Sequence, residues 1–436
     1  MQRYDSYKDS GVKWLGEIPS HWEVMPIKRI AKTFAGATPN SSNEKYWGGT
    51  IAWVTPADFK TETKFIKEGN RCLTELGLNS CSATLVPQDS VVFSKRAPVG
   101  QISITTQPLC TNQGCISCVP FNIVKSTFLY YLLSIYKETF ESFSGGTTFK
   151  EISQQTFNDF RISLPPLDEQ VKMVSYLDAA TSKIDEAIAQ QQKMIDLLNE
   201  RKQIIINDAV TKGLDPNVKM KPSGIDWIGD IPEHWEVNKL KNLCKMYGRI
   251  GFRGYSAIDL VEEGEGAITL SPTNFDNGVL SFEKCSYLSW AKYYESPEIM
   301  VKPGDIVFVK TASIGKVAYV ENIPLETTVN PQILVMKDII VESKYLAFYL
   351  QSSLIQGWIF ATSNGSTILT IPQTTIGVYP ILLPPVDEQK TIVKSIESEF
   401  EKIDSALKLA KKQISLLQER KQIIINDVVT GKVKVI

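Results

Sequence analysis

The chain contains a long internal repeat, and this repeat constrains its fold more than any other feature. ERKQIIINDAVT at 200–211 recurs as ERKQIIINDVVT at 419–430, an offset of 219 with one difference in twelve residues. PPLDEQ at 165–170 recurs as PPVDEQ at 384–389, and SGVKWLGEIPSHWEV at 10–24 recurs as SGIDWIGDIPEHWEV at 223–237. Solenoid repeats are much shorter, about 20–50 residues. The sequence therefore predicts two related domains with related connecting segments.

The composition is that of an ordinary globular protein and adds few constraints. Hydrophobic residues make up 43% of the 436 residues, charged residues 22%, and the formal net charge is −1. The chain lacks a continuous apolar run of membrane-spanning length, and its N-terminus has no apolar signal segment, so we expect a cytoplasmic protein. Seven irregularly spaced cysteines argue against a disulfide framework.

A long amphipathic pattern follows each proline pair. Asp168 and Asp387 are suited to cap a helix N-terminus, and apolar residues then recur at alternating spacings of three and four for about five heptads. A helix of about 40 residues would span roughly 60 Å. The predicted seam comprises Val174, Leu177, Ile184, Ile188, Ile195 and Leu198 in the first helix, and Val393, Ile396, Ile403, Leu407, Ile414 and Leu417 in the second.

Neither helix could bury its apolar seam on its own. Two equal seams in one chain favour an intramolecular antiparallel coiled coil, with Gln191 and Ala410 helping to fix its register. The alternative is that the helices stay separate and each recruits another protein.

The segments that precede the proline pairs are predicted to be mainly β-structure. Runs rich in Val, Ile, Phe and Tyr alternate with Gly and Pro turns, for example at 90–105 and 305–320. One amphipathic helix is expected at 127–143 and one at 343–360. The resulting fold class is α+β, with two similar β-rich domains separated by two long helices that pair as an antiparallel coiled coil, in a pseudo-twofold internal repeat. The expected boundaries are a first domain at 1–164, a helix at 165–213, a connecting segment with the second domain at 214–383, and a second helix at 384–436.

Catalytic motifs are sparse. The chain has two histidines, His21 and His234, at the same position of the repeat, which indicates a structural role. The sequence has no P-loop, no G-x-S-x-G elbow and no target-base motif of amino-methyltransferases. Cys110, Cys115 and Cys118 have part of an iron–sulfur spacing, but the second copy lacks these cysteines, so we expect buried strand residues. We predict no catalytic, cofactor or metal site in this chain.

The duplicated frame with two divergent domains resembles the specificity subunit of a type I restriction–modification system. The resemblance covers almost the whole chain. The segments that carry it are GATPNSSNEKYWGGTIAWVTPADF at 36–59, the LPP[LV]DEQ boundaries at 164–170 and 383–389, the ERKQIIIND helix ends, GRIGFRGYS at 248–256 and KPGDIVFVKTASIGK at 302–316.

This resemblance implies a DNA-binding, non-catalytic subunit of a restriction endonuclease and adenine methyltransferase complex. Each variable domain would read one half of an asymmetric bipartite site in double-stranded DNA, and the helix pair would set the spacer. Two methyltransferase subunits, carrying S-adenosylmethionine, would dock on the helices and methylate adenine. Restriction and translocase subunits using ATP and Mg²⁺ would join the assembly.

Three alternatives remain open at this stage. The chain could serve a methyltransferase without a restriction subunit. It could be a self-contained nuclease or methyltransferase, which the missing motifs disfavour. It could also be a scaffold that binds proteins rather than DNA, and a near-zero net charge is the only support for that hypothesis.

Candidate DNA-contacting residues lie where the two domains differ and are polar, aromatic, basic or glycine residues. Arginines rank first, because a guanidinium can pair with guanine through two hydrogen bonds. In the first domain the candidates are Thr38, Asn40, Tyr46, Trp47, Thr55, Asp58, Lys95, Arg96, Gly145, Gly146 and Thr147. In the second they are Arg249, Arg253, Tyr255, Thr273, Asn274, Lys310, Thr311, Ser313, Asn364, Ser366 and Thr367.

Overall fold

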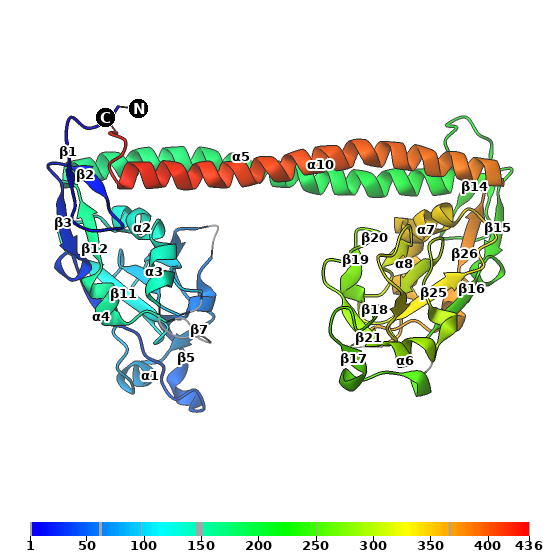
Figure 1. Ribbon diagram of the computed structural model, residues 1–436, viewed down its shortest axis with the longest axis horizontal. Helices are drawn as coiled ribbons and strands as arrows, with labels where there is room; N and C mark the ends of the chain where they lie inside the picture. The colour runs from blue at the N-terminus through cyan, green and yellow to red at the C-terminus, as the bar shows by residue number, and fades with distance from the viewer. Residues whose placement is uncertain are drawn as a thin grey trace. The chain divides into compact units, whose positions relative to one another are not determined.

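The fold is known from a computed structural model, which describes residues 2–60, 63–96, 98–144, 151–249, 251–365 and 368–435 (Figure 1). The chain divides into two compact units. Unit 1 comprises residues 1–192 and 412–436, and unit 2 comprises residues 193–411. Within the described ranges, no helix combines the length and the apolar character needed to cross a membrane.

Both long helices begin two residues after the predicted positions, and the first ends one residue early, whereas the second ends seven residues before the expected boundary at 436. Helix α5 extends over Leu167–Lys212 and helix α10 over Val386–Val429. Asp168 and Asp387 therefore lie in the first helical turn, and the expectation that they cap the helices is wrong. Their charges still lie near the positive end of the helix dipole, which stabilises the helix N-terminus.

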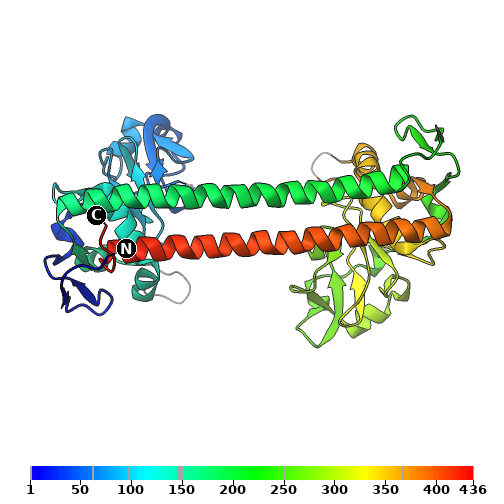
Figure 2. The same cartoon turned by 90° about the horizontal axis from the view of Figure 1, so that it is seen from above.

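Segments of α5 and α10 pair antiparallel within each unit, as Figure 2 shows. In unit 1, Lys421 Nζ lies 2.6 Å from Asp185 Oδ1. In unit 2, Lys202 Nζ lies 2.6 Å from Asp404 Oδ1. The two ion pairs involve the same two positions of the repeat, 219 residues apart. All twelve predicted seam residues are buried or half-buried, so the predicted antiparallel helix pair is confirmed.

The globular part of unit 1 contains a five-stranded sheet, ordered β4-β11-β8-β9-β6, and a three-stranded sheet, ordered β10-β5-β7. Two short antiparallel pairs, β1 with β2 and β3 with β12, connect this part to α5. The strands are β1 Tyr7–Asp9, β2 Glu17–Pro19, β3 Glu23–Pro26, β4 Ala31–Ala35, β5 Trp47–Val54, β6 Phe65–Ile66, β7 Arg71–Leu73, β8 Val91–Ser94, β9 Ile102–Thr105, β10 Leu109–Thr111, β11 Cys115–Pro120 and β12 Arg161–Leu164. The helices are α1 Glu75–Asn79, α2 Ser126–Ser134, α3 Lys137–Phe143 and α4 Gln154–Asp159.

Unit 2 repeats this plan with two four-stranded sheets, ordered β16-β25-β22-β23 and β17-β21-β18-β24. Its strands are β13 Met220–Pro222, β14 Asp230–Pro232, β15 Glu236–Lys239, β16 Lys245–Gly248, β17 Leu260–Val261, β18 Gly266–Leu270, β19 Phe275–Asp276, β20 Val279–Leu280, β21 Ser286–Ser289, β22 Ile306–Val309, β23 Val317–Tyr319, β24 Thr327–Val329, β25 Ile333–Lys337 and β26 Pro380–Leu383. Its helices are α6 Trp290–Tyr294, α7 Ser343–Gln351, α8 Ser353–Ala361 and α9 Gln373–Gly377.

Strand pairing confirms that the two globular parts share one frame. Strand β11 lies between β4 and β8, as β25 lies between β16 and β22. Each unit also has one equivalent parallel pair, β5 with β10 and β18 with β24. The single helix predicted in each part is two helices in the structure. In unit 2 the break falls at Ser352, which has an extended backbone and donates its hydroxyl to the Tyr349 carbonyl.

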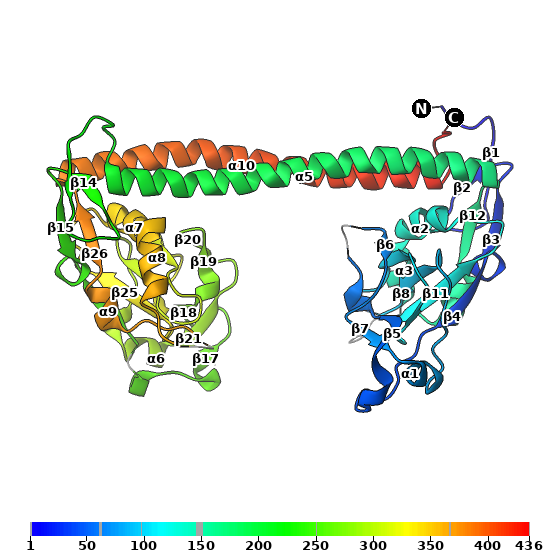
Figure 3. The same ribbon diagram turned by 180° about the vertical axis from the view of Figure 1, so that it is seen from behind.

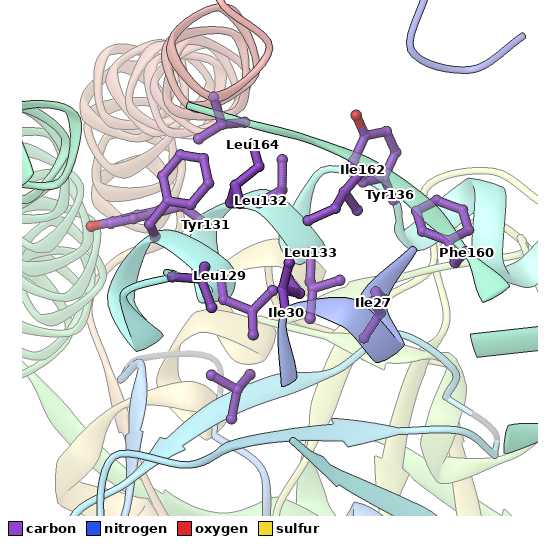
Figure 4. Close-up of a cluster of buried hydrophobic side chains, with 14 of the residues drawn as sticks. Ile27, Ile30, Leu129, Tyr131, Leu132, Leu133, Tyr136, Phe160, Ile162 and Leu164 are labelled. Carbon is purple, nitrogen blue, oxygen red and sulfur yellow. The ribbon is translucent and has the colours of Figure 1, made fainter. Parts of the chain in front are cut away.

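Each unit completes its core with the end of a long helix. The unit 1 core contains Ile425, Val428 and Val429 from the last turns of α10, packed with residues such as Trp22. The unit 2 core contains Ile206, Ala209 and Val210 from the last turns of α5. Figure 4 shows the aliphatic and aromatic side chains of α2 and β12 that form the interior of unit 1. Packing therefore explains the third isoleucine of each IIIND segment, Ile206 and Ile425, whereas the first, Ile204 and Ile423, is exposed.

The repeated His-Trp and Asp-Glu-Gln motifs form an equivalent latch in each unit. Glu169 of α5 accepts hydrogen bonds from Trp22 Nε1 at 3.2 Å and Tyr4 Oη at 3.0 Å, and its Oε1 lies 2.6 Å from His21 Nε2. The next residue, Gln170, is fully buried, bonding the Lys125 amide and the Pro165 carbonyl.

In unit 2, Glu388 accepts from Trp235 at 3.1 Å and lies 2.7 Å from His234 Nε2. These contacts confirm the structural role predicted for both histidines.

We predict that Glu169→Ala lowers the free energy of unfolding of unit 1 by about 2–3 kcal/mol, because the buried Trp22 indole N–H loses its charged acceptor. Glu388→Ala should cost unit 2 less, since among the described residues Glu388 has no counterpart of the Tyr4 bond. Thermal denaturation of the full chain, followed by tryptophan fluorescence, measures both effects. Melting curves equal to the unaltered chain would contradict the latch.

Candidate nucleic-acid interface

Three of the candidate residues hold turns at the ends of equivalent strands. In unit 1, Thr55 and Asp58 form a capping box around the 3-10 turn Pro56–Asp58, and Asp58 also accepts from the Asn70 amide at 3.0 Å. In unit 2, Asn274 caps the equivalent turn and donates to the Ser281 and Lys284 carbonyls. The side-chain hydrogen bonds of these residues are therefore committed to the protein. Thr273 is exposed, with its hydroxyl 2.7 Å from that of Ser271.

The predicted basic pair of unit 1 shares one carboxylate. Lys95 Nζ lies 2.9 Å from Glu151 Oε1, and Arg96 Nε lies 2.8 Å from Glu151 Oε2. Burial alone would raise the pKa of Glu151, but the hydrogen bonds and charges of the two bases outweigh it and hold that pKa below its usual value. The backbone of Lys95 also bonds Gly114, beside Gln113, whose side chain accepts from Thr38. Thr38 and Lys95 are thus brought to one turn.

Unit 2 lacks the acid at the equivalent position. Arg96 forms a β-bridge with Glu151, and Thr311 forms the corresponding bridge with Thr370. The hydroxyls of Thr311 and Thr370 lie 2.9 Å apart. Lys310, the counterpart of Lys95, is half-buried, and among the described residues its ammonium group has no hydrogen-bond or ion-pair partner. Burial lowers the pKa of Lys310. The net charge at these positions is +1 in both units, but in unit 1 it is shared among Lys95, Arg96 and Glu151, whereas in unit 2 it lies on Lys310 alone.

The remaining loop candidates of unit 2 lie beside Lys310. Ala312 has a left-handed backbone with φ of 65°, and Ser313 next to it is exposed. Asn364 is exposed and exchanges two backbone hydrogen bonds with Thr370. Five candidates lie outside the described residues, namely Gly145, Gly146, Thr147, Ser366 and Thr367.

The two arginines predicted to be the strongest base contacts differ in accessibility. Arg249 is only 5% exposed and donates to the Val329 carbonyl, the Thr328 hydroxyl and the Arg253 carbonyl. Its guanidinium braces the loop from inside, so this arrangement does not favour a base contact. Arg253 is half-buried and pairs with Glu298 at 3.2 Å. Tyr255 is also half-buried, with its hydroxyl 3.2 Å from that of Thr269.

Trp47 begins β5 of the three-stranded sheet, which lies away from α5 in Figure 3, and Tyr46 ends the 3-10 turn Glu44–Tyr46 just before it. Asn40 is exposed and Tyr46 half-buried. Trp47 Nε1 donates to the Asn40 carbonyl at 3.3 Å, and the Trp47 ring meets the Trp53 ring edge-on at 5.0 Å. Arg71 was not among the predicted residues, and its guanidinium carbon lies 3.4 Å from the Trp47 ring centroid. Only the alternation of a short strand could have suggested it, because Trp47 and Arg71 are 24 positions apart.

The prediction that Cys110, Cys115 and Cys118 are buried strand residues is confirmed. All three are fully buried, and all seven cysteines are free thiols. Burial raises the pKa of Cys118 to about 12. Across the described residues, no cluster of three His, Cys, Asp or Glu side chains is arranged to hold a metal ion.

Comparison with known proteins identifies the duplicated frame. Residues 19–195 and 232–416 match the type I restriction modification DNA specificity domain. The chain belongs to this family. It is therefore the non-catalytic specificity component of a restriction–modification system, with two such domains.

Curated relatives match this chain over most of their length, and a solved structure shares its fold. The chain is 26% identical to the type I restriction enzyme MjaIX specificity subunit of Methanocaldococcus jannaschii, covering 97% of this chain and 95% of that protein. It is 21% identical to the EcoKI specificity subunit of Escherichia coli K12, covering 96% and 90%. A chain solved in a study of type I R-M complex assembly and conformational transition shares the fold, with a TM-score of 0.69 and 16% identity over 95% of this chain and 99% of that one.

Proposed function

We propose that each globular part of this chain reads one half of an asymmetric bipartite DNA site, and that the helix pair sets the distance between the halves. The main support is that one frame occurs twice with different side chains at equivalent surface positions. Glu151 corresponds to Thr370, and Arg96 corresponds to Thr311. Side chains at base edges specify sequence, whereas contacts to phosphate only position the protein. Two unlike surfaces on one frame therefore favour two unlike half-sites.

The partners follow from the family and from the exposed faces of the helices. Leu197 and Ile204 of α5, and Leu416 and Ile423 of α10, are 51–53% exposed and occupy matching positions of the repeat. A spacing of seven places each pair on one helix face. We infer that these two apolar faces dock two methyltransferase subunits, which bring S-adenosylmethionine and methylate adenine. Restriction subunits that use ATP and Mg²⁺ would complete the assembly, and this chain would bind none of these cofactors.

Selection from random DNA tests the recognition role. The full chain, purified with the methyltransferase encoded beside it, is incubated with a pool of randomised duplexes, and the bound duplexes are sequenced. We expect enrichment of one interrupted sequence with two unlike halves and a fixed gap. Enrichment of a palindrome, or of no sequence at all, would contradict the proposal.

Glu151 and Thr370 occupy equivalent positions of the two units. Exchanging their residue types, as Thr370→Glu and as Glu151→Thr, should change the DNA affinity of the two variants in opposite directions. Thr370→Glu gives Lys310 an acid partner, so it should weaken binding to all duplexes and lower the salt dependence by about one phosphate contact. Glu151→Thr frees Lys95 and Arg96, and should strengthen binding. Titrations at several salt concentrations measure both slopes. If the slope of affinity against salt concentration were identical in the two variants and the unaltered chain, phosphate contacts at Lys95 and Lys310 would be excluded.

Charged substitutions on the helix faces test docking. In the full chain, replacing Leu197 and Ile204 by glutamate should remove about half of the co-purified methyltransferase, and adding Leu416→Glu and Ile423→Glu should remove nearly all of it, because a charge cannot be buried unpaired in an apolar interface. Gln203→Glu, which adds a charge at an exposed position about 100° around the helix from Ile204, is the matched control. Full retention of methyltransferase in the fourfold variant would place docking elsewhere.

A further inference from the structure

Arg71 is held flat against Trp47 on the exposed side of the small sheet of unit 1. Its guanidinium carbon lies 3.4 Å from the ring centroid, a distance at which the two planes must stack. Arg71 is exposed, and no acidic side chain of the described residues lies within ion-pair distance of it. Arg96 and Arg253, by contrast, are each paired with a glutamate. Stacking covers one face of the guanidinium and leaves its N–H groups, which lie in the guanidinium plane, free to donate.

The ring beneath Arg71 is itself fixed by the protein. Trp47 donates to the Asn40 carbonyl at 3.3 Å, while Trp53, in edge contact with Trp47, donates to the Ala37 carbonyl at 3.0 Å. Two glycines allow this close packing. A Cβ at Gly49 would lie 2.3 Å from the Leu73 carbonyl oxygen, and one at Gly77 would lie 2.2 Å from that of Tyr46. The Trp47 platform, comprising Trp47, Trp53 and Arg71, is therefore a built surface.

The equivalent position in unit 2 carries a different residue. Arg71 pairs with Trp53 across strands β7 and β5, and Ser286 pairs with Thr269 across β21 and β18. The two ladders correspond, because Val54 and Leu270 each accept from the asparagine that follows the parallel strand. A residue that differs at one position of a shared frame is placed to distinguish two unlike half-sites.

We propose that Arg71 reads a guanine in one of the two half-sites, with Trp47 holding the guanidinium ready. The N7 and O6 atoms of guanine form a pair of acceptors in the major groove that matches the guanidinium fork. Arginine side chains otherwise lose considerable rotamer freedom on binding, and the stacked arrangement removes part of that loss before DNA arrives. This inference rests on the proposed DNA-recognition function and names the base class that one residue of it would recognise.

The test couples removal of the arginine to removal of one guanine atom. Duplexes carry the sequence selected by the unaltered complex, with each guanine of both half-sites replaced in turn by 7-deazaguanine, which lacks the N7 acceptor. For the unaltered complex, one position in one half-site should weaken binding about tenfold. For Arg71→Ala, binding to the unmodified duplex should fall by a similar factor, and the deaza substitution at that position should have no further effect. Replacements in the other half-site serve as internal controls.

Several outcomes would overturn the inference. One is that no guanine of either half-site is coupled to Arg71. Another is that Arg71→Ala weakens binding to all duplexes equally and lowers the salt slope by one unit, which would make Arg71 a phosphate contact. Trp47→Ala, with its fold checked by thermal denaturation, should weaken discrimination at the same base pair. If the unaltered complex selects no sequence, the proposed function fails. If it selects one without coupling to Arg71, only this inference fails.

Discussion

The structure depends on the exchange of helix ends between the two repeats. The last turns of α10 enter the core of unit 1, where Val428 and Val429 are buried beside N-terminal residues. The last turns of α5 do the same in unit 2 through Ala209 and Val210. Each unit therefore takes part of its interior from a segment distant in the sequence. Burial of such aliphatic side chains contributes roughly 1.5–3 kcal/mol each, so neither globular part is complete without its helix end.

Where the globular part contacts the long helix, the two units have different side chains at equivalent positions. In unit 1, Asp178 of α5 accepts from the Tyr131 hydroxyl at 2.6 Å and pairs with Lys64 at 2.6 Å. In unit 2, Glu397 at the equivalent helix position pairs with Lys344 at 2.6 Å, and Phe348 meets Phe400 edge-on at 5.9 Å. The latch of Glu, His and Trp is the same in both units. The two units therefore already differ at the contact between globular part and helix, next to a latch that is the same in both.

The two related domains and the helix pair could be predicted from the sequence because each depends on a pattern of residues that are close together in the chain or repeated in it. Heptad spacing gave the helix pair, and repetition gave the two related β-rich parts. The role of Glu169 was missed, because helix-cap statistics drew attention to Asp168 and the partners Tyr4 and Trp22 lie about 150 positions away.

The candidate site was less predictable, since residue type alone does not distinguish an exposed arginine from a buried one. Arg249 was nominated and is buried, whereas Arg71 was overlooked and lies exposed on Trp47. Which of two lysines keeps an unpaired charge depends on Glu151 or Thr370, residues brought close only by the fold.

A map of methylated adenine across the genome would show whether this chain directs methylation to a bipartite site. Cells carrying this chain with its methyltransferase are compared with cells from which this chain alone has been deleted. We expect a single interrupted, asymmetric motif that disappears on deletion, giving both half-sites and the gap between them. An unchanged methylation pattern, with the methyltransferase shown to be active, would contradict a role in sequence recognition.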